Sequence, residues 1–363
     1  MVQPTRPPKN SLNATMRKLY NPLGFTRFYN FILWFIFAGA LFGFVLARFM
    51  YLNFSGIFCS RSPSPGNSAA PGECYYYVNF NQYKVGIIMH LATILPAGVL
   101  VVLQFTPAIR HKAIMFHRIN GYVVLMLYVV SMVGCFMIIR HAFGGGLDTQ
   151  AGLATIAIAS IVSFVLSYIN IKRLQIEQHR AWMLRGWFYA GCIITERIIQ
   201  ISAAQIISKA NNYFTTRPCY QIDYIYNTRE PVLAIYPECE AYYSGTNPGQ
   251  QALVHATMNN DNPVEIGAAL GISFGMAIWL AFAIHAIGVE IYLHLTPREA
   301  ERLRNVSYQR QLEAGMRNAG SAGLTVNRLG DAEDWVPQQR KGSENTLVGH
   351  NGAAVNDKQQ QTS

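Results

Sequence analysis

The sequence predicts an all-α integral membrane protein with six transmembrane helices and both termini in the cytosol. Of its 363 residues, 51% are hydrophobic and 13% are charged, whereas charged residues make up about 25% of a soluble domain. Apolar runs long enough to cross a bilayer, which takes about 20 residues per helix, occur six times. They lie at residues 30–52, 85–106, 118–140, 151–171, 184–207 and 266–290.

The positions of the basic residues predict the orientation. Cytosolic loops of membrane proteins carry an excess of Lys and Arg, and this chain has a formal net charge of +10. The excess is concentrated before the first span, in the loops after the second and fourth spans, and after the last span. Topology therefore accounts for the charge, and we expect a lipid bilayer rather than nucleic acid as the partner.

Composition divides the chain into three regions. Residues 1–29 combine prolines with basic residues and are expected to be a flexible cytosolic arm. The membrane domain covers residues 30–295, and its long outer loop at 208–265 is expected to form a small lid. Residues 296–363 are expected to be a cytosolic tail that begins with a short amphipathic helix and is otherwise mostly disordered.

The cysteines predict two disulfides on the outer side. Cys59 and Cys74 lie in the first loop, and Cys219 and Cys239 lie in the fifth. Pairing within each loop is favoured, while two bridges between the loops stay open. The sequon at Asn53 makes glycosylation of the first loop possible. Both features predict a location in the secretory pathway or plasma membrane.

Five histidines lie at the ends of the apolar runs and are predicted to form two layers. Neutral imidazole is an axial ligand of haem iron, so two layers of histidine are what two b-type haems would need, one near each face. The bland interpretation is that these side chains cap helices or meet lipid headgroups. The five residues are His90 and His141 near the outer face, and His117, His179 and His285 near the inner face.

Arg185 and Arg197 are candidate partners for the haem propionates. His90 and His117 are the favoured ligands among the five histidines. No cluster of residues predicts any other metal site, and no phosphate-binding loop or nucleophile motif is present.

Glu196 and Arg197 form a polar pair near the middle of the fifth span. Ionisable residues inside a membrane are costly and often functional. Because side chains at neighbouring helix positions do not face each other, we expect the two residues to have separate partners. They form either a small-molecule or proton site, or a buried network that only fixes helix register.

Two motifs carry a resemblance to a known family. His117-Arg118-Ile119-Asn120-Gly121-Tyr122 begins the third span, and Gln178-His179-Arg180-Ala181-Trp182-Met183-Leu184-Arg185 begins the fifth. With His90, they resemble a family of predicted multi-pass membrane proteins known only as a domain of unknown function (DUF2306), and the chain resembles a fungal member. The resemblance covers about residues 85–208 and implies a membrane fold without implying an activity.

The chain also resembles, more loosely, the di-haem b-type cytochromes of six spans, to which it is similar in topology. That family takes one histidine ligand from each of the four central helices. The fourth span here has no histidine between residues 151 and 171, so His141 or His285 would have to substitute.

Three classes of function follow from these patterns. The leading hypothesis is a b-haem-type membrane oxidoreductase. The second is a non-redox protein that binds or transports a small molecule or protons at Glu196, Arg197 and His90. The third is a membrane partner whose polar interior is purely structural.

Overall fold

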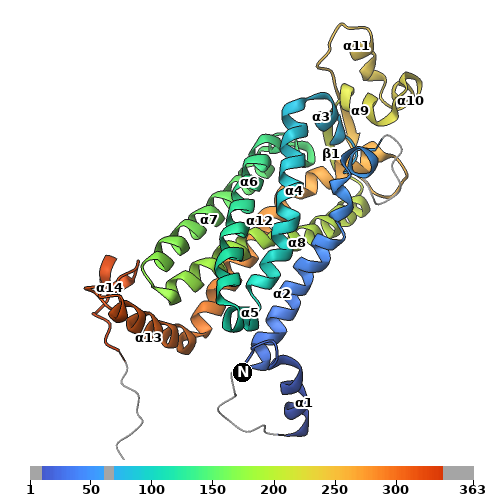
Figure 1. Cartoon of the computed structure of the whole chain (residues 1–363). Coiled ribbons are helices and arrows are strands. Elements are labelled where there is room, and N and C mark those ends of the chain that lie inside the picture. Colours follow the sequence, from blue (N-terminus) through green and yellow to red (C-terminus); the bar gives the residue numbers. More distant parts are fainter. Residues whose placement is uncertain (1–9, 61–68, 338–363) are drawn as a thin grey trace, which may run out of the picture.

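The computed structural model describes residues 10–60 and 69–337, and these form a long helical bundle (Figure 1). Within the described residues, six helices are long and apolar enough to cross a membrane, so the predicted number of spans is confirmed. The first runs from Phe28 to Leu52 and contains α2 (Phe28–Leu46). The other five are α4 (Asn81–Gln104), α6 (Ile114–Ile138), α7 (Leu147–Lys172), α8 (Ile176–Ala210) and α12 (Pro263–Leu295).

The spans pack mainly as neighbouring pairs. Helix α4 packs against α6, α7 against α8, and α12 against α8, while α2 lies against α4. Tyr128 of α6 joins two of these pairs, because its buried ring meets Phe164 of α7 and Trp187 of α8 at centroid distances of 5.1 and 5.5 Å. Its hydroxyl lies 2.5 Å from Ser160 Oγ. This buried tyrosine, whose hydroxyl is hydrogen-bonded, therefore connects α6 with both α7 and α8.

Large apolar side chains cover the outside of the bundle. Phe35, Met126, Ile198 and Ile287 are each more than 60% exposed. Apolar surface on this scale is not stable in water, and it marks the faces that meet lipid.

One end of the bundle carries a folded lid, which consists of residues 211–262 (Figure 1). Strands β1 (Phe214–Pro218) and β2 (Gln251–His255) pair antiparallel, with Phe214 opposite His255. Between the strands lie α9 (Cys219–Tyr226), α10 (Arg229–Ile235) and α11 (Glu240–Tyr243). We call this end of the molecule the lid end.

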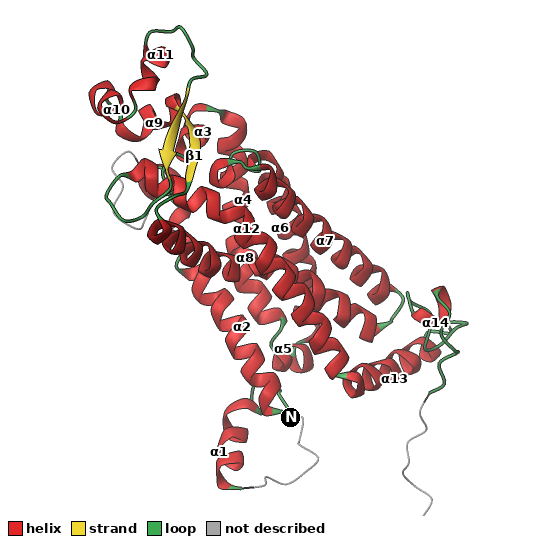
Figure 2. Cartoon of the chain, turned by 180° about the vertical axis from the view of Figure 1, so that it is seen from behind, coloured by secondary structure: helices red, strands yellow, loops and turns green. Residues whose placement is uncertain are grey.

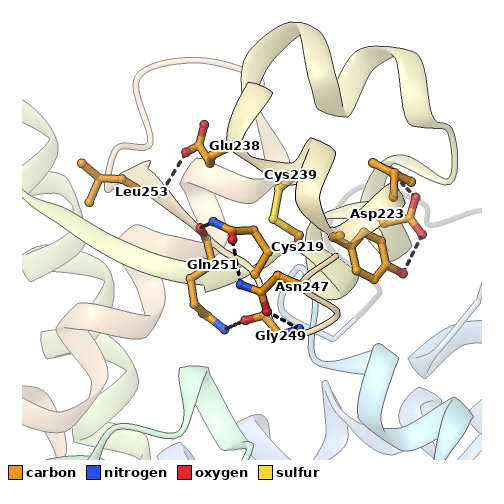
Figure 3. Close-up of a disulfide and its surroundings, with 11 residues drawn as sticks. Cys219, Asp223, Glu238, Cys239, Asn247, Gly249, Gln251 and Leu253 are labelled. Atoms are coloured by element: carbon orange, nitrogen blue, oxygen red, sulfur yellow. Dashed lines mark hydrogen bonds between the residues drawn. A yellow bond between two sulfur atoms is a disulfide. The ribbon is translucent and has the colours of Figure 1, made fainter. Parts of the chain in front are cut away.

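The Cys219–Cys239 disulfide ties α9 to the segment that precedes α11 (Figure 3). Both cysteines are fully buried. Asp223 accepts hydrogen bonds from two tyrosines that follow this bridge, Tyr243 at 2.5 Å and Tyr242 at 3.5 Å. The lid therefore has a small core of its own.

The loop between the first two spans packs against the lid. A second disulfide joins Cys59 to Cys74 at the start of α3 (Cys74–Asn79). Tyr75 of α3 stacks on Tyr220 of α9 at 4.8 Å, and Gln221 Nε2 donates to the carbonyl of Gly72. Pairing of the cysteines within each loop is thus confirmed.

The opposite end of the molecule, which we call the tail end, carries α1 (Ser11–Tyr20) and α5 (Pro107–Lys112), and from it extends α13 (Pro297–Glu313), as Figure 2 also shows. Residues 10–29 are not a free arm in the structure. The Ala108 backbone N–H donates to the carbonyl of Leu23 at 2.9 Å, and Tyr20 and Phe25 are buried against Phe31. Residues 1–9 of the predicted arm lie outside the described part.

The chain after α13 docks on the turn between α7 and α8. Gln175 in this turn is fully buried, and its amide group donates to Gly320 O and Glu177 Oε1 and accepts from Gly323 N and Gln311 Nε2. These four bonds use the full capacity of one amide. We call this contact of residues 307–325 with residues 170–177 the clasp.

The clasp is ordered, whereas most of the tail after its first helix was expected to be disordered. A polar segment stays disordered when it buries few groups, but here backbone groups of the tail bond to the buried Gln175. Helix α14 (Val326–Leu329) follows the clasp. Residues 338–363 of the predicted tail lie outside the described part.

Candidate functional site

His90 of α4 is held by Ser131 of α6. Its Nδ1 lies 2.9 Å from Ser131 Oγ and 3.2 Å from the Ser131 carbonyl oxygen. Because a carbonyl only accepts, the second contact requires the proton on Nδ1. The neutral ring then keeps a free lone pair on Nε2, which is the form of histidine that binds a metal.

His179 of α8 repeats this arrangement with Ser167 of α7. Its Nδ1 lies 2.7 Å from Ser167 Oγ and 3.2 Å from the Ser167 carbonyl oxygen. The serine hydroxyl is also 3.0 Å from the carbonyl of His179. Two histidines in two different helix pairs are therefore fixed by a serine of the neighbouring helix in the same way.

His117 lies at the tail end of α6 and has an unsatisfied nitrogen. Its Nδ1 is buried and has no hydrogen-bond partner among the described residues. Its backbone carbonyl accepts from Gln104 Nε2 at 2.9 Å, which places His117 level with the end of α4. His117 near the start of α6 and His179 near the start of α8 both lie at the tail end, and the charge of His179 acts on His117.

Two arginines add positive charge around this pair. Arg110 of α5 interacts with both His117 and His179, and Arg118 interacts with His117. Burial lowers the pKa of Arg110, the charge of Glu299 partly offsets this, and the charges of Arg302 and Arg180 lower it further. A cationic surrounding of this kind favours an anionic ligand.

His285 and His141 have other surroundings. His285 Nδ1 lies 2.8 Å from the carbonyl of Phe188, and its Nε2 lies 2.8 Å from Thr195 Oγ1. Both of its nitrogens are therefore occupied. The His141 ring stacks on Tyr76 at 3.8 Å in the loop at the lid end, where burial lowers its pKa.

Arg185 is bound within the bundle. Its Nε and Nη2 donate to the two carboxylate oxygens of Glu290 on α12 at 2.6 and 2.9 Å. The guanidinium also lies 4.6 Å from the ring centre of Trp182. Such a bidentate pair leaves Arg185 little freedom to meet another anion.

Glu196 and Arg197 contact each other, which corrects the expectation of separate partners. Arg197 Nε lies 3.4 Å from Glu196 Oε2. The long side chain of Arg197 runs along the helix surface, so that its Nε approaches Glu196 while its Nη1 donates to Gln200 Oε1 at 3.0 Å.

The Arg197 guanidinium also faces two aromatic rings at the lid end. It lies 4.1 Å from the ring centre of Phe143 and 5.3 Å from that of Phe274. These rings stack on each other at 4.3 Å. The Phe143 backbone N–H donates to Glu73 Oε1 at 2.8 Å, which connects the loop after α6 to the loop between the first two spans.

Glu73 and Arg217 form a buried charged site that the sequence reasoning did not identify. Both side chains are 8% exposed. Burial raises the pKa of Glu73 and lowers that of Arg217, while each charge partly offsets the effect on the other. Arg217 donates to the carbonyl of Gly267 at 2.5 Å, and a Cβ at Gly271 would come within 2.6 Å of its Nη2.

One sequence feature could have indicated Glu73, namely its position next to Cys74. A disulfide at Cys74 holds the neighbouring residue close to the helical bundle. In the described part of the chain, no group of three or more His, Cys, Asp or Glu side chains could hold a metal ion. Any metal bound by these histidines would therefore need further ligands of its own, as haem iron has.

Comparison with curated proteins and with solved structures gives no match. Residues 87–217, from α4 to β1, match the model of a family described as predicted membrane protein (DUF2306). This match supports the resemblance seen in the His117 and His179 motifs. Together with the six spans, it identifies an integral membrane protein that is similar to this family over those residues.

Proposed function

We propose that this protein is a b-haem-type membrane oxidoreductase in which His117 and His179 are the axial ligands at the tail end. The observation that carries the proposal is the contact of His179 Nδ1 with the Ser167 carbonyl oxygen. A second-sphere acceptor on one ring nitrogen is what metal-ligating histidines usually have. The unsatisfied nitrogen of His117, which lies at the same end of the bundle as His179, supplies the second ligand.

The residues at this end fit the group in charge as well as in ligand type. Haem carries two propionates, and Arg110 and Arg118 bring positive charge to the two histidines. We therefore propose these arginines, in place of Arg185 and Arg197, as propionate partners. Arg185 is paired with Glu290, and Arg197 donates to Gln200 and faces Phe143 at the lid end.

Haem, when bound, would supply one-electron transfer. The protein would hold the His179 imidazole neutral and oriented, because Ser167 fixes its proton on Nδ1. Two histidine ligands leave no open coordination position, which favours electron transfer over binding of a small substrate to the iron.

We propose one haem rather than two. His117 lies level with Gln104, and His90 is fourteen residues earlier on α4, which is about 21 Å along a helix axis. His90 and His117 are therefore too far apart to share an iron. Of the remaining candidates, His285 has both nitrogens occupied.

An absorption spectrum tests the proposal. Protein expressed with haem supplied and purified in detergent should show a Soret band that shifts on reduction. His117→Ala and His179→Ala should each abolish it, whereas His111→Ala, which changes an exposed tail-end histidine on α5, should not. His90→Ala should leave the haem-to-protein ratio unchanged. Folded wild-type protein without a Soret band would refute the proposal.

We also propose that the lid faces the lumen or cell exterior and that the tail end faces the cytosol. The two disulfides and the basic residues near the tail end support this orientation. Asn53 is exposed near the lid end and is then accessible for glycosylation. After reduction, Cys59 and Cys239 should react with an impermeant thiol reagent added outside intact cells, and Asn53→Gln should remove any glycan. Labelling only after permeabilisation of the plasma membrane would contradict a cell-surface location.

A further inference from the structure

Glu196 is the most isolated charged group in the described part of the bundle. Its side chain is 0% exposed, and neither carboxylate oxygen has a hydrogen-bond partner among the described residues. Arg197 lies within 3.4 Å, but the contact does not have hydrogen-bond geometry. An ionised carboxylate without donors loses its hydration without replacement, and one ion-pair contact rarely offsets that loss.

The surroundings of Glu196 supply few other charges. The neighbouring part of α12 contributes apolar side chains, because Phe274, Ile278 and Ala281 pack with Cys192, one turn before Glu196. The buried hydroxyl of Ser273, also on α12, has no hydrogen-bond partner among the described residues. The charged or titratable groups on the described elements around this region include Arg197 and Cys192 of α8, His285 of α12, which contacts Thr195, Asp148 of α7 beside Gly275 of α12, Arg48 at the end of the first span, Tyr77 of α3 and Glu73 before α3.

Arg197 connects this isolated carboxyl group to the lid end. Its side chain is 26% exposed while that of Glu196 is not exposed at all. Its guanidinium lies 4.1 Å from the ring centre of Phe143, and the backbone N–H of Phe143 donates to Glu73 Oε1 beneath the lid. Phe143 therefore connects Arg197 to a second buried carboxyl group, Glu73.

We propose that Glu196 is a proton-binding site inside the membrane and that it exchanges its proton with the lid end past Arg197 and Glu73. A neutral carboxyl group does not need the two or three donors that a carboxylate needs in a dry interior. The partner is thus a proton, and the site is independent of whether haem is bound at the tail end.

Infrared spectroscopy on the full-length protein in lipid nanodiscs tests the site. Wild-type protein near neutral pH should show the carbonyl band of a protonated carboxyl group that shifts in D₂O. Glu196→Gln, which keeps the size of the side chain, should remove the part of this band that comes from Glu196 and leave only the part from the buried Glu73. Glu290→Gln should keep the whole band, because Glu290 is an ionised partner of Arg185. A band of unchanged intensity in Glu196→Gln would overturn the proposal.

Two further measurements separate the alternatives. Glu73→Gln is measured separately, since Glu73 is also buried; it should leave the Glu196 band in place and slow its exchange with D₂O several-fold. Unchanged exchange would refute the route past Glu73. A band that disappears when sodium is raised at constant pH would indicate a cation site and refute a proton site.

Folding failure of Glu196→Gln would not remove the test. Isotope labelling of glutamate in wild-type protein should shift the band, and absence of any label-sensitive carboxyl band would overturn the proposal. Arg197→Gln gives a second check. If Glu196 is neutral, this variant should stay folded, whereas an ionised Glu196 left without its cation should cause a large loss of melting temperature.

Discussion

The hydroxyl of Ser167 holds His179 across the α7–α8 interface through two contacts. The hydroxyl of Ser167 lies 2.7 Å from His179 Nδ1 and 3.0 Å from the backbone carbonyl of His179. Ser131 and His90 have a looser version of the same arrangement, in which the corresponding hydroxyl-to-carbonyl distance is 3.5 Å. The tighter pair lies at the tail end, where we propose the haem ligands.

Ser167→Ala should destabilise the protein by about 1 kcal/mol, since it removes the hydroxyl but leaves the contact of Nδ1 with the carbonyl oxygen. Thermal unfolding in detergent measures this change. Ser202→Ala is the matched control, because Ser202 is exposed on α8 and its hydroxyl bonds only to the carbonyl of Ile198. Equal melting temperatures for the two variants would contradict a positioning role for Ser167.

Glu73→Gln should stabilise the protein more and more as pH rises. Burial raises the pKa of Glu73 in the folded state, so the folded state binds its proton more tightly than the unfolded state does. Stability from this group is full below its unfolded pKa of about 4.3 and is lost as pH rises through the folded value. The glutamine variant cannot ionise and does not show this loss.

The measurement for Glu73 is a series of melting temperatures for wild type and Glu73→Gln from acidic to neutral pH. The two proteins should converge at the acidic end and separate above it. Glu240→Gln serves as control, because Glu240 is an exposed lid glutamate paired with Arg229. A wild type that gains stability over Glu73→Gln with rising pH would show that Glu73 is ionised in a favourable ion pair.

Gln311→Ala should release the clasp. Its amide makes three hydrogen bonds, to the carbonyl of Arg173, Gln175 Oε1 and the N–H of Gly320. Their loss removes about 3 kcal/mol of local stability at about 1 kcal/mol each. Limited proteolysis should then cleave residues 314–337 much faster than in wild type, while Gln309→Ala, an exposed change on the same helix, should have no effect.

Replacing both Cys219 and Cys239 by serine should loosen the lid and spare the spans. The bridge closes a loop with a sequence separation of 20, and cross-links of this length contribute about 3 kcal/mol. The lid should become sensitive to protease without loss of the helical signal from the membrane part. Retention of the Cys59–Cys74 bridge, checked by mass spectrometry, is the control; a lid as resistant as in wild type would contradict the prediction.

The six spans could be predicted because their signal is local. A run such as residues 118–140 needs only length and apolar composition to indicate a span. Pairing of Cys59 with Cys74 was favoured for a similar reason, since both lie in one short loop. Each of these features is contained in a single segment of the chain.

The contacts of the candidate site depend on register between segments and were not predictable. No pattern around Ser131 or Ser167 indicates that either serine meets a histidine 41 or 12 positions away. The contact of Glu196 with Arg197 depends on the rotamer of a long side chain. Disorder was predicted for the tail because its composition is polar, and its buried partners lie more than 130 residues earlier.

Because of the clasp, the turn between the fourth and fifth spans can complete its hydrogen bonds only after the tail has been synthesised. Until residues 320–324 emerge from the ribosome, the amides of Gln175 and Asn170 lack the tail backbone groups that satisfy them. The turn between the fourth and fifth spans is then incomplete although both spans are already synthesised. Quality control that recognises exposed polar turns would thus retain a chain truncated before residue 320, even one with all six spans inserted.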